Sequence, residues 1–256
     1  MDNNHSINEF DFNLICEYFS STHRQGPGSE ECTLKALSFI DGLHQMKHIA
    51  DIGCGTGAST LTLAQHTTAC ITAVDLFPKF LEHLNAEAHR TGLEHRIQTM
   101  AADMNSLPFD EESMDLIWSE GAIYNMGFRQ GLTAWKKILK EGGYIGVTDA
   151  SWTTAERPDT IRDFWTDAYP QIDTVWNNLQ KLVDCGYEPV ATFLLPTECW
   201  TDEFYIPQQE AQRLFLEKHG DNPTARMLVE NQRKEARLFE EYNQYYGYVF
   251  YIGRKR

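Results

Sequence analysis

Three glycines and one aspartate between residues 50 and 76 are spaced to hold a nucleoside. Gly53, Gly55 and Gly57 follow the run 48–52, and Asp75 ends an apolar run at 71–74. Glycine lets the chain turn sharply and lets a ligand approach bare backbone, where unpaired N–H groups at a helix start favour electron-rich atoms. Asp75 stands where its carboxylate can accept hydrogen bonds from two ribose hydroxyls. These residues indicate a site for a nucleoside cofactor.

Two strands and the helix between them must position this site. The run 48–52 suits a buried parallel strand, residues 58–64 suit a helix packed on it, and the run 71–74 suits a second strand. The glycine spacing also fits the dinucleotide pattern G-x-G-x-x-G/A. The glycines alone therefore leave the choice between nucleoside cofactors open.

Strands and helices alternate along the rest of the chain. A helix is predicted from Pro78 to Thr91, with Gly92 as its stop. Helical spacing also marks residues 7–22, the stretch from the N-cap Ser29 to Leu43, two stretches within 151–188, and 208–243. Further strands are predicted at 97–101, 115–118, 144–148, 189–195 and 245–252, with a turn at 141–143. This alternation is typical of an α/β fold with a doubly wound sheet, which binds ligands beyond the carboxyl ends of its strands.

Four segments together resemble a known family. Asp51-Ile-Gly-Cys-Gly-Thr-Gly-Ala is followed by Ala73-Val-Asp75, by Asp103-Met-Asn-Ser-Leu-Pro-Phe-Asp, and by Ser113-Met-Asp-Leu-Ile-Trp-Ser-Glu-Gly. They resemble class I S-adenosylmethionine-dependent methyltransferases. Within that group they are most similar to small-molecule enzymes related to the C-methyltransferases of ubiquinone and menaquinone biosynthesis. The resemblance covers roughly residues 30–150.

The resemblance implies a Rossmann-like, doubly wound sheet of seven strands in the order 3-2-1-4-5-7-6, with the last strand antiparallel. Residues 1–256 would form one methyltransferase domain. Residues 1–29 would be an N-terminal lid, and helical cap inserts at 151–188 and 199–243 would cover the acceptor side. The implied activity is that of an enzyme that transfers a methyl group, in line, from S-adenosyl-L-methionine to a small-molecule acceptor.

The resemblance also assigns residues to the cofactor. Asp75 would hold the ribose, Asp103 and the backbone of Met104 the adenine, and Asp51 the glycine loop or the ammonium group. The full set that it implies is Asp51, Gly53, Cys54, Gly55, Gly57, Asp75, Leu76, Ala102, Asp103, Met104, Ser119 and Glu120, with Tyr18, Gln25, Gly26 and Ser29 from the lid.

Glu120 and Tyr124 are the candidate acid and base groups if the acceptor must lose a proton, because the pKa of a carboxyl buried near a cationic cofactor is tunable. A hydrogen bond from backbone is the alternative role for Glu120. Two other functions stay open: an NAD-type Rossmann oxidoreductase, and an S-adenosylmethionine-binding protein that transfers no methyl group. The sequence leaves open the acceptor and the methylated atom, O, N or C.

Charge and composition argue against several partners. The 22 basic and 37 acidic residues give a net charge of −15, which disfavours a nucleic-acid partner. No stretch approaches the ~20 apolar residues of a membrane span. Six scattered cysteines without a C-x-x-C pair, and no secretory leader, predict the reducing cytoplasm. Nine histidines show no ligand spacing, so no metal is expected, and a homodimer is possible.

Overall fold

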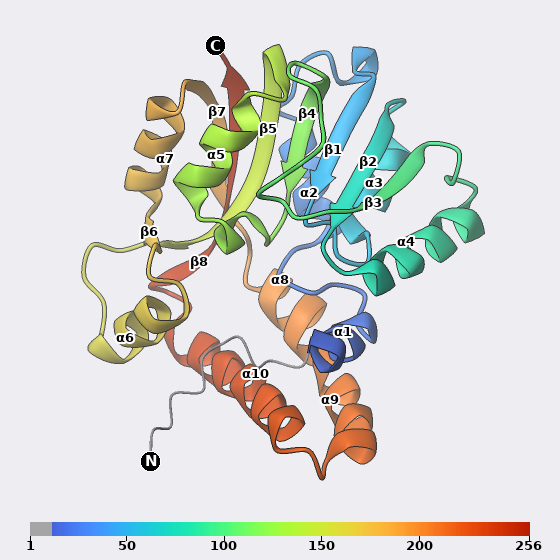
Figure 1. Ribbon diagram of the computed structural model, residues 1–256. Coiled ribbons are helices and arrows are strands. Elements are labelled where there is room, and N and C mark those ends of the chain that lie inside the picture. Colours follow the sequence, from blue (N-terminus) through green and yellow to red (C-terminus); the bar gives the residue numbers. More distant parts are fainter. Residues whose placement is uncertain (1–11) are drawn as a thin grey trace.

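A mixed β-sheet of eight strands runs through the centre of the molecule (Figure 1). The computed structural model describes residues 12–256. The parallel strands are β1 (His48–Ile52), β2 (Cys70–Asp75), β3 (Ile97–Ala101), β4 (Met114–Ser119) and β5 (Leu139–Trp152). One edge is completed by β7 (Tyr187–Leu194) and β8 (Tyr246–Lys255), and the short β6 (Asp173–Thr174) pairs with the end of β5.

The strand order is β3-β2-β1-β4-β5-β8-β7, and β8 is antiparallel to both of its neighbours. This confirms the predicted order, because β7 and β8 are the predicted sixth and seventh strands. The fifth strand is longer than predicted. The expected turn at 141–143 is a shift of register within β5, where Gly142 has a φ of +71°. At the start of β5, Leu139 pairs with Met114 of β4, and from Tyr144 to Trp152 the strand pairs with β8, so it extends on both sides of the predicted strand at 144–148.

Helices cover both faces of the sheet. One face carries α2 (Glu30–Leu37), α3 (Ala58–His66) and α4 (Pro78–Thr91), and the other carries α5 (Phe128–Lys136) and α7 (Val175–Asp184). The start and end of α4 are as predicted, but α2 ends at Leu37, before Leu43. The position of α7 differs from the cap expected over 151–188. Its fully buried Leu182 packs in the core against the sheet, because the apolar face of this helix is stabilised by burial.

A helical layer lies beyond the carboxyl ends of the parallel strands (Figure 1). It consists of α1 (Phe12–Ser20), α8 (Glu198–Trp200), the π-helical turn η4 (Thr201–Tyr205), α9 (Ile206–His219) and α10 (Pro223–Tyr242), with α6 (Asp159–Ala168) beside α10. The block predicted at 208–243 is thus two helices, and Asn222 caps the second. Residues 1–11 of the predicted lid lie outside the described residues. Within residues 12–256, no helix is long and apolar enough to cross a membrane.

Candidate active site

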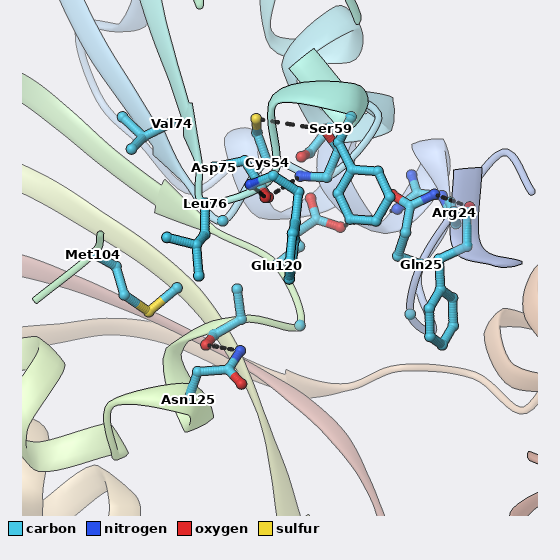
Figure 2. Close-up of a pocket in the computed structure, with 18 of the residues that line it drawn as sticks. Arg24, Gln25, Cys54, Ser59, Val74, Asp75, Leu76, Met104, Glu120 and Asn125 are labelled. Carbon is cyan, nitrogen blue, oxygen red and sulfur yellow. Dashed lines mark hydrogen bonds and ion pairs between the residues drawn. The ribbon is translucent and has the colours of Figure 1, made fainter. Parts of the chain in front are cut away.

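A cavity of about 620 Å³ opens where β1, β2, β3 and β4 end (Figure 2). Its walls come from the glycine turn after β1, from the segments after β2, β3 and β4, and from residues of the N-terminal segment. Twelve of the predicted site residues line it: Gln25, Gly26, Gly53, Cys54, Gly55, Asp75, Leu76, Ala102, Asp103, Met104, Glu120 and Tyr124. The predicted residues Tyr18, Ser29, Asp51, Gly57 and Ser119 are not in its walls.

Asp75 joins the end of β2 to the glycine turn. Its Oδ2 accepts a hydrogen bond from the N–H of Gly55 at 2.9 Å, and its Oδ1 accepts one from the N–H of Phe77 at 2.9 Å. Burial raises the pKa of Asp75, and these backbone bonds oppose that shift. A carboxylate oxygen has two acceptor positions, so both oxygens can still bind hydroxyl groups from the cavity.

The glycine turn has no room for side chains. Gly53 has a φ of +74°, and a Cβ atom there would lie 2.3 Å from the Cβ of Ala122. Gly55 has a φ of +56°, and its Cβ would lie 2.3 Å from the Oε1 of Gln25. Both glycines face the cavity, so they form a backbone cradle for a ligand.

Asp51 lies behind this cradle. Its Oδ2 accepts hydrogen bonds from the hydroxyl groups of Ser59 at 3.0 Å and Thr60 at 2.6 Å, which ties the end of β1 to the start of α3. Burial raises the pKa of Asp51 to about 7. Its buried Oδ1 has no hydrogen-bond partner among residues 12–256. An orphaned carboxylate oxygen next to a backbone cradle fits the ammonium end of an amino-acid cofactor.

Two more predicted residues act on the backbone around the cavity. Gly57 caps α3 with a φ of +92°, and a Cβ there would lie 2.2 Å from a methyl carbon of Leu84. The Ser119 hydroxyl donates to the carbonyl of Ile52 at 2.7 Å, which joins β4 to β1. Both residues therefore shape the cavity from behind its wall.

The predicted adenine side is open to solvent. Asp103 is exposed, and its Oδ1 accepts two bonds from Asn105, from the backbone N–H at 2.9 Å and from Nδ2 at 2.8 Å. The bonds from Asn105 lower the pKa of Asp103, so this carboxylate is charged at neutral pH. Its Oδ2 accepts no hydrogen bond from the described residues. Leu76, which is 57% exposed, supplies an apolar surface on the same side.

Glu120 is held by three donors. Its Oε1 accepts from the Thr33 hydroxyl at 2.6 Å and from the Trp118 indole N–H at 2.8 Å, and its Oε2 pairs with Arg24 at 3.3 Å. The Glu120 side chain is only 5% exposed. These contacts join β4, α2 and the N-terminal segment, which favours a structural role over proton transfer.

Tyr124 belongs to η3 (Ile123–Asn125) and lines the cavity. It is 39% exposed, and its ring meets Tyr169 edge to face at 5.9 Å. Partial loss of hydration in the cavity wall raises the pKa of Tyr124, and the charge of Glu235 adds to the shift. The phenol therefore keeps its proton at neutral pH and can donate a hydrogen bond to a ligand.

The N-terminal segment closes one end of the cavity. Gln25 Oε1 accepts from the backbone N–H of Thr56 at 2.9 Å, and Gln25 Nε2 donates to the Thr56 hydroxyl at 3.0 Å. Sequence reasoning missed Arg24 and Phe19, which also line the cavity. No local signal marks them, because only docking of the segment brings them to the site. Ser29 caps α2 by accepting from the N–H of Cys32.

Tyr18 points away from the cavity. It is fully buried between α1 and α9, where its hydroxyl donates to Gln208 at 2.5 Å and accepts from Gln212 at 3.2 Å. Its ring packs edge to face on Phe215 at 5.4 Å. Tyr18 therefore packs between helices and does not line the cavity, in contrast to the predicted cofactor contact.

Comparison with known proteins agrees with this geometry. Residues 49–143 match the family model described as a methyltransferase domain. A demethylmenaquinone methyltransferase from Tropheryma whipplei is 32% identical over 140 residues, which are 54% of this chain and 53% of the relative. The chain spans about half the length of the curated relatives it matches. Residues 49–143 are therefore similar to methyltransferase domains, which supports the class I S-adenosylmethionine-dependent type that the sequence predicts.

Solved structures share the fold over nearly the whole chain. A SAM-dependent methyltransferase from Geobacter sulfurreducens, solved in complex with S-adenosyl-L-homocysteine, has a TM-score of 0.80 at 18% identity and covers 95% of this chain and 98% of its own. The cyclase SpnF has a TM-score of 0.77 at 20% identity and covers 96% of this chain and 93% of its own. Proteins named for different activities thus share this Rossmann-like fold.

Proposed function

We propose that this protein is an S-adenosylmethionine-dependent methyltransferase that acts on a small-molecule acceptor. The observation that carries the proposal is Asp75, whose carboxylate lines the cavity and holds the N–H of Gly55 beside it. A nucleoside with an amino-acid tail needs two contacts. They are a carboxylate at the end of the second strand and a glycine turn without side chains after the first. The methyltransferase domain at residues 49–143 supports the same activity.

Each end of the cofactor has a matching group. Asp75 would bind the ribose hydroxyls, and Asp103 and Met104 would bind the adenine. The backbone cradle, with Asp51 behind it, would bind the methionine part. S-adenosyl-L-methionine supplies a methyl group on a positively charged sulfur. The work of the protein is to line up the acceptor behind that methyl group and to exclude water.

The contacts of Glu120 and Tyr124 suggest different roles for the two residues. The carboxylate of Glu120 positions Arg24 and the N-terminal segment at the mouth of the cavity. Tyr124 would orient the acceptor by donating its phenolic hydrogen. The lid at 1–29, the cytoplasmic location, the absence of a nucleic-acid partner and the homodimer stay predictions.

Thermal unfolding with different nucleosides tests the cofactor. S-adenosyl-L-homocysteine at 100 times its dissociation constant adds ~2.7 kcal/mol of stability. For a domain of this size, ~1 kcal/mol raises Tm by about 2–4 °C, so a rise of about 5–10 °C is expected. NAD and NADH should leave Tm unchanged. A shift with NAD(H) and none with either adenosyl compound would support the oxidoreductase instead.

A second function, binding of the cofactor without methyl transfer, is raised by SpnF, which has this fold and is named as a cyclase. Turnover separates the two functions. A transferase forms S-adenosyl-L-homocysteine in proportion to the acceptor consumed. A protein that binds the cofactor tightly and forms none with any acceptor tried, amines included, would be a binding protein or an enzyme of another class.

A further inference from the structure

Arg24 brings a positive charge into the wall of the cavity. No other Arg, Lys or His among residues 12–256 lines the cavity, and its walls also carry three acids, Asp75, Asp103 and Glu120. The Arg24 side chain is 7% exposed and lies where the N-terminal segment closes the cavity. An arginine in the wall of a ligand cavity can bind a carboxylate through its planar fork of N–H groups.

The guanidinium of Arg24 has donors to spare. Nη1 donates to Oε2 of Glu120 at 3.3 Å, which is longer than the about 2.7–2.9 Å that is usual for a charged pair. Nε and Nη2 donate to no group in the part of the chain that the structure describes. Neither of these two nitrogens is fully buried, so a ligand can reach both. A second carboxylate can therefore share this guanidinium with Glu120.

The glycine turn itself has no donor left for an anion. Each of the five backbone N–H groups from residue 53 to residue 57 already donates to a protein oxygen, at 2.8–3.0 Å. A negatively charged group that enters over the turn must find its donors elsewhere. Two groups near the turn can supply them, the guanidinium of Arg24 and the N-terminal turn of α3.

The walls of the cavity set the direction in which the cofactor extends. Leu76 and Met104 lie on one side of the cavity, and Arg24 lies on the opposite side (Figure 2). With the adenine beside Met104 and the ribose on Asp75, the methionine part extends away from Leu76 and toward Arg24. The carboxylate of the methionine part is the anionic group of this molecule, so it reaches the side of the cavity where Arg24 lies.

We propose that Arg24 binds the carboxylate of the methionine part of S-adenosyl-L-methionine, and that this contact holds the N-terminal segment closed over the cofactor. The assignment rests on the proposed function, and it adds a residue that the sequence does not mark. Nε and Nη2 donate to the carboxylate while Nη1 keeps its contact with Glu120. A nucleoside without that carboxylate fills the same cavity but leaves the segment more often open.

Two competing explanations make different predictions. The start of α3 is the other place for the carboxylate, because backbone N–H groups and the helix dipole favour an anion there. In that case, loss of the Arg24 charge leaves the preference for a carboxylate intact. Alternatively, Arg24 serves only to hold the segment through Glu120. Its replacement then weakens ligands with and without the carboxylate alike.

The test compares two thioether nucleosides that differ in one group. S-adenosyl-L-homocysteine carries an ammonium and a carboxylate, and S-adenosyl-3-thiopropylamine lacks the carboxylate alone. Calorimetry on the full chain measures the dissociation constant of each, and the ratio of the two constants reports the carboxylate. We expect the wild type to bind S-adenosyl-L-homocysteine at least about tenfold more tightly, as a charged hydrogen bond provides. Arg24→Gln should bind the two within about threefold of each other.

Control variants separate this contact from charge in general. Arg90→Gln removes an exposed arginine of α4 that pairs with Glu87, and it should keep the wild-type ratio. Arg24→Lys keeps the positive charge and should give a ratio above that of Arg24→Gln. A wild-type ratio within about threefold, or an unchanged ratio in Arg24→Gln, would overturn the carboxylate contact while the proposed function stands. Failure of both nucleosides to bind the wild type would overturn the proposed function and the contact together.

Trypsin tests whether the contact closes the segment. Cleavage after Arg24 requires this residue to leave the cavity, so the cleavage rate follows the open fraction when closing is fast. With both nucleosides at saturating concentrations, S-adenosyl-L-homocysteine should slow this cleavage at least about fivefold more than S-adenosyl-3-thiopropylamine. Equal protection by the two nucleosides would show that the carboxylate does not hold the segment closed.

Discussion

Replacing Gln25 should release the N-terminal segment from the glycine turn. The Gln25 amide accepts a hydrogen bond from the backbone N–H of Thr56 at 2.9 Å and makes a second with the Thr56 hydroxyl, either as donor through Nε2 at 3.0 Å or as acceptor through Oε1 at 3.1 Å. A hydrogen bond contributes ~0.5–1.5 kcal/mol net, so Gln25→Ala should cost the closed state ~1–3 kcal/mol. Because each ~1.4 kcal/mol is tenfold, the open fraction should rise about 5- to 150-fold.

Limited trypsin digestion measures this opening. Arg24 is 7% exposed and paired with Glu120, so cleavage after Arg24 requires the segment to leave its place. When closing is faster than cleavage, the cleavage rate follows the open fraction. Rates are divided by those of the same variant unfolded in urea, which corrects for the changed residue next to the cut. S-adenosyl-L-homocysteine should slow cleavage of the wild type.

Gln45→Ala, an exposed change elsewhere, is the control and should cleave like the wild type. A corrected rate for Gln25→Ala within twofold of the wild type would refute the reasoning that these bonds hold the segment closed. Equal cleavage of the wild type with and without S-adenosyl-L-homocysteine would refute the lid that the sequence predicts.

Three further changes test the cavity. Asp75→Ala should weaken binding of S-adenosyl-L-homocysteine about ten- to a hundredfold, measured by calorimetry, because a charged hydrogen bond contributes ~1.5–3 kcal/mol. Unchanged affinity in a folded variant would show that Asp75 does not bind the cofactor. Gly53→Ala should lower the free energy of unfolding in urea by ~2–5 kcal/mol, from the strained positive φ and the collision with Ala122, and a loss under ~1 kcal/mol contradicts that geometry. The pKa of Asp149 is raised to about 8, so folding favours the protonated carboxyl. The stability that this proton contributes is lost as the pH rises from about 4 through 8. The Tm of Asp149→Asn should therefore rise relative to that of the wild type as the pH increases from 5 to 8. A Tm difference that does not grow with pH would contradict a raised pKa of Asp149.

Local chemistry made the cofactor side predictable. Glycines with positive φ, an acid at the end of a strand, and a proline and a glycine at the ends of a helix act on their near neighbours, so the sequence shows them directly. The sheet order and eleven of the predicted cofactor residues in the cavity wall follow from such signals and from the family resemblance. The extra strand residues at 149–152 of β5 were missed because pairing with β8, about 100 residues later, decides them.

The sequence by itself thus determined the nucleoside cradle and the α/β order of the chain. Only the tertiary structure decided what closes that cradle and what faces the acceptor. Arg24 meets Glu120 across 96 positions of sequence, and Tyr18 turns toward α9 across 190. The same holds for the neighbouring aromatic rings of Tyr124, Tyr169, Trp200, Tyr205 and Tyr248, which come from η3, the residue after α6, α8, η4 and β8. Contacts of this kind carry no local signal, because they form only when the layers of the fold pack together.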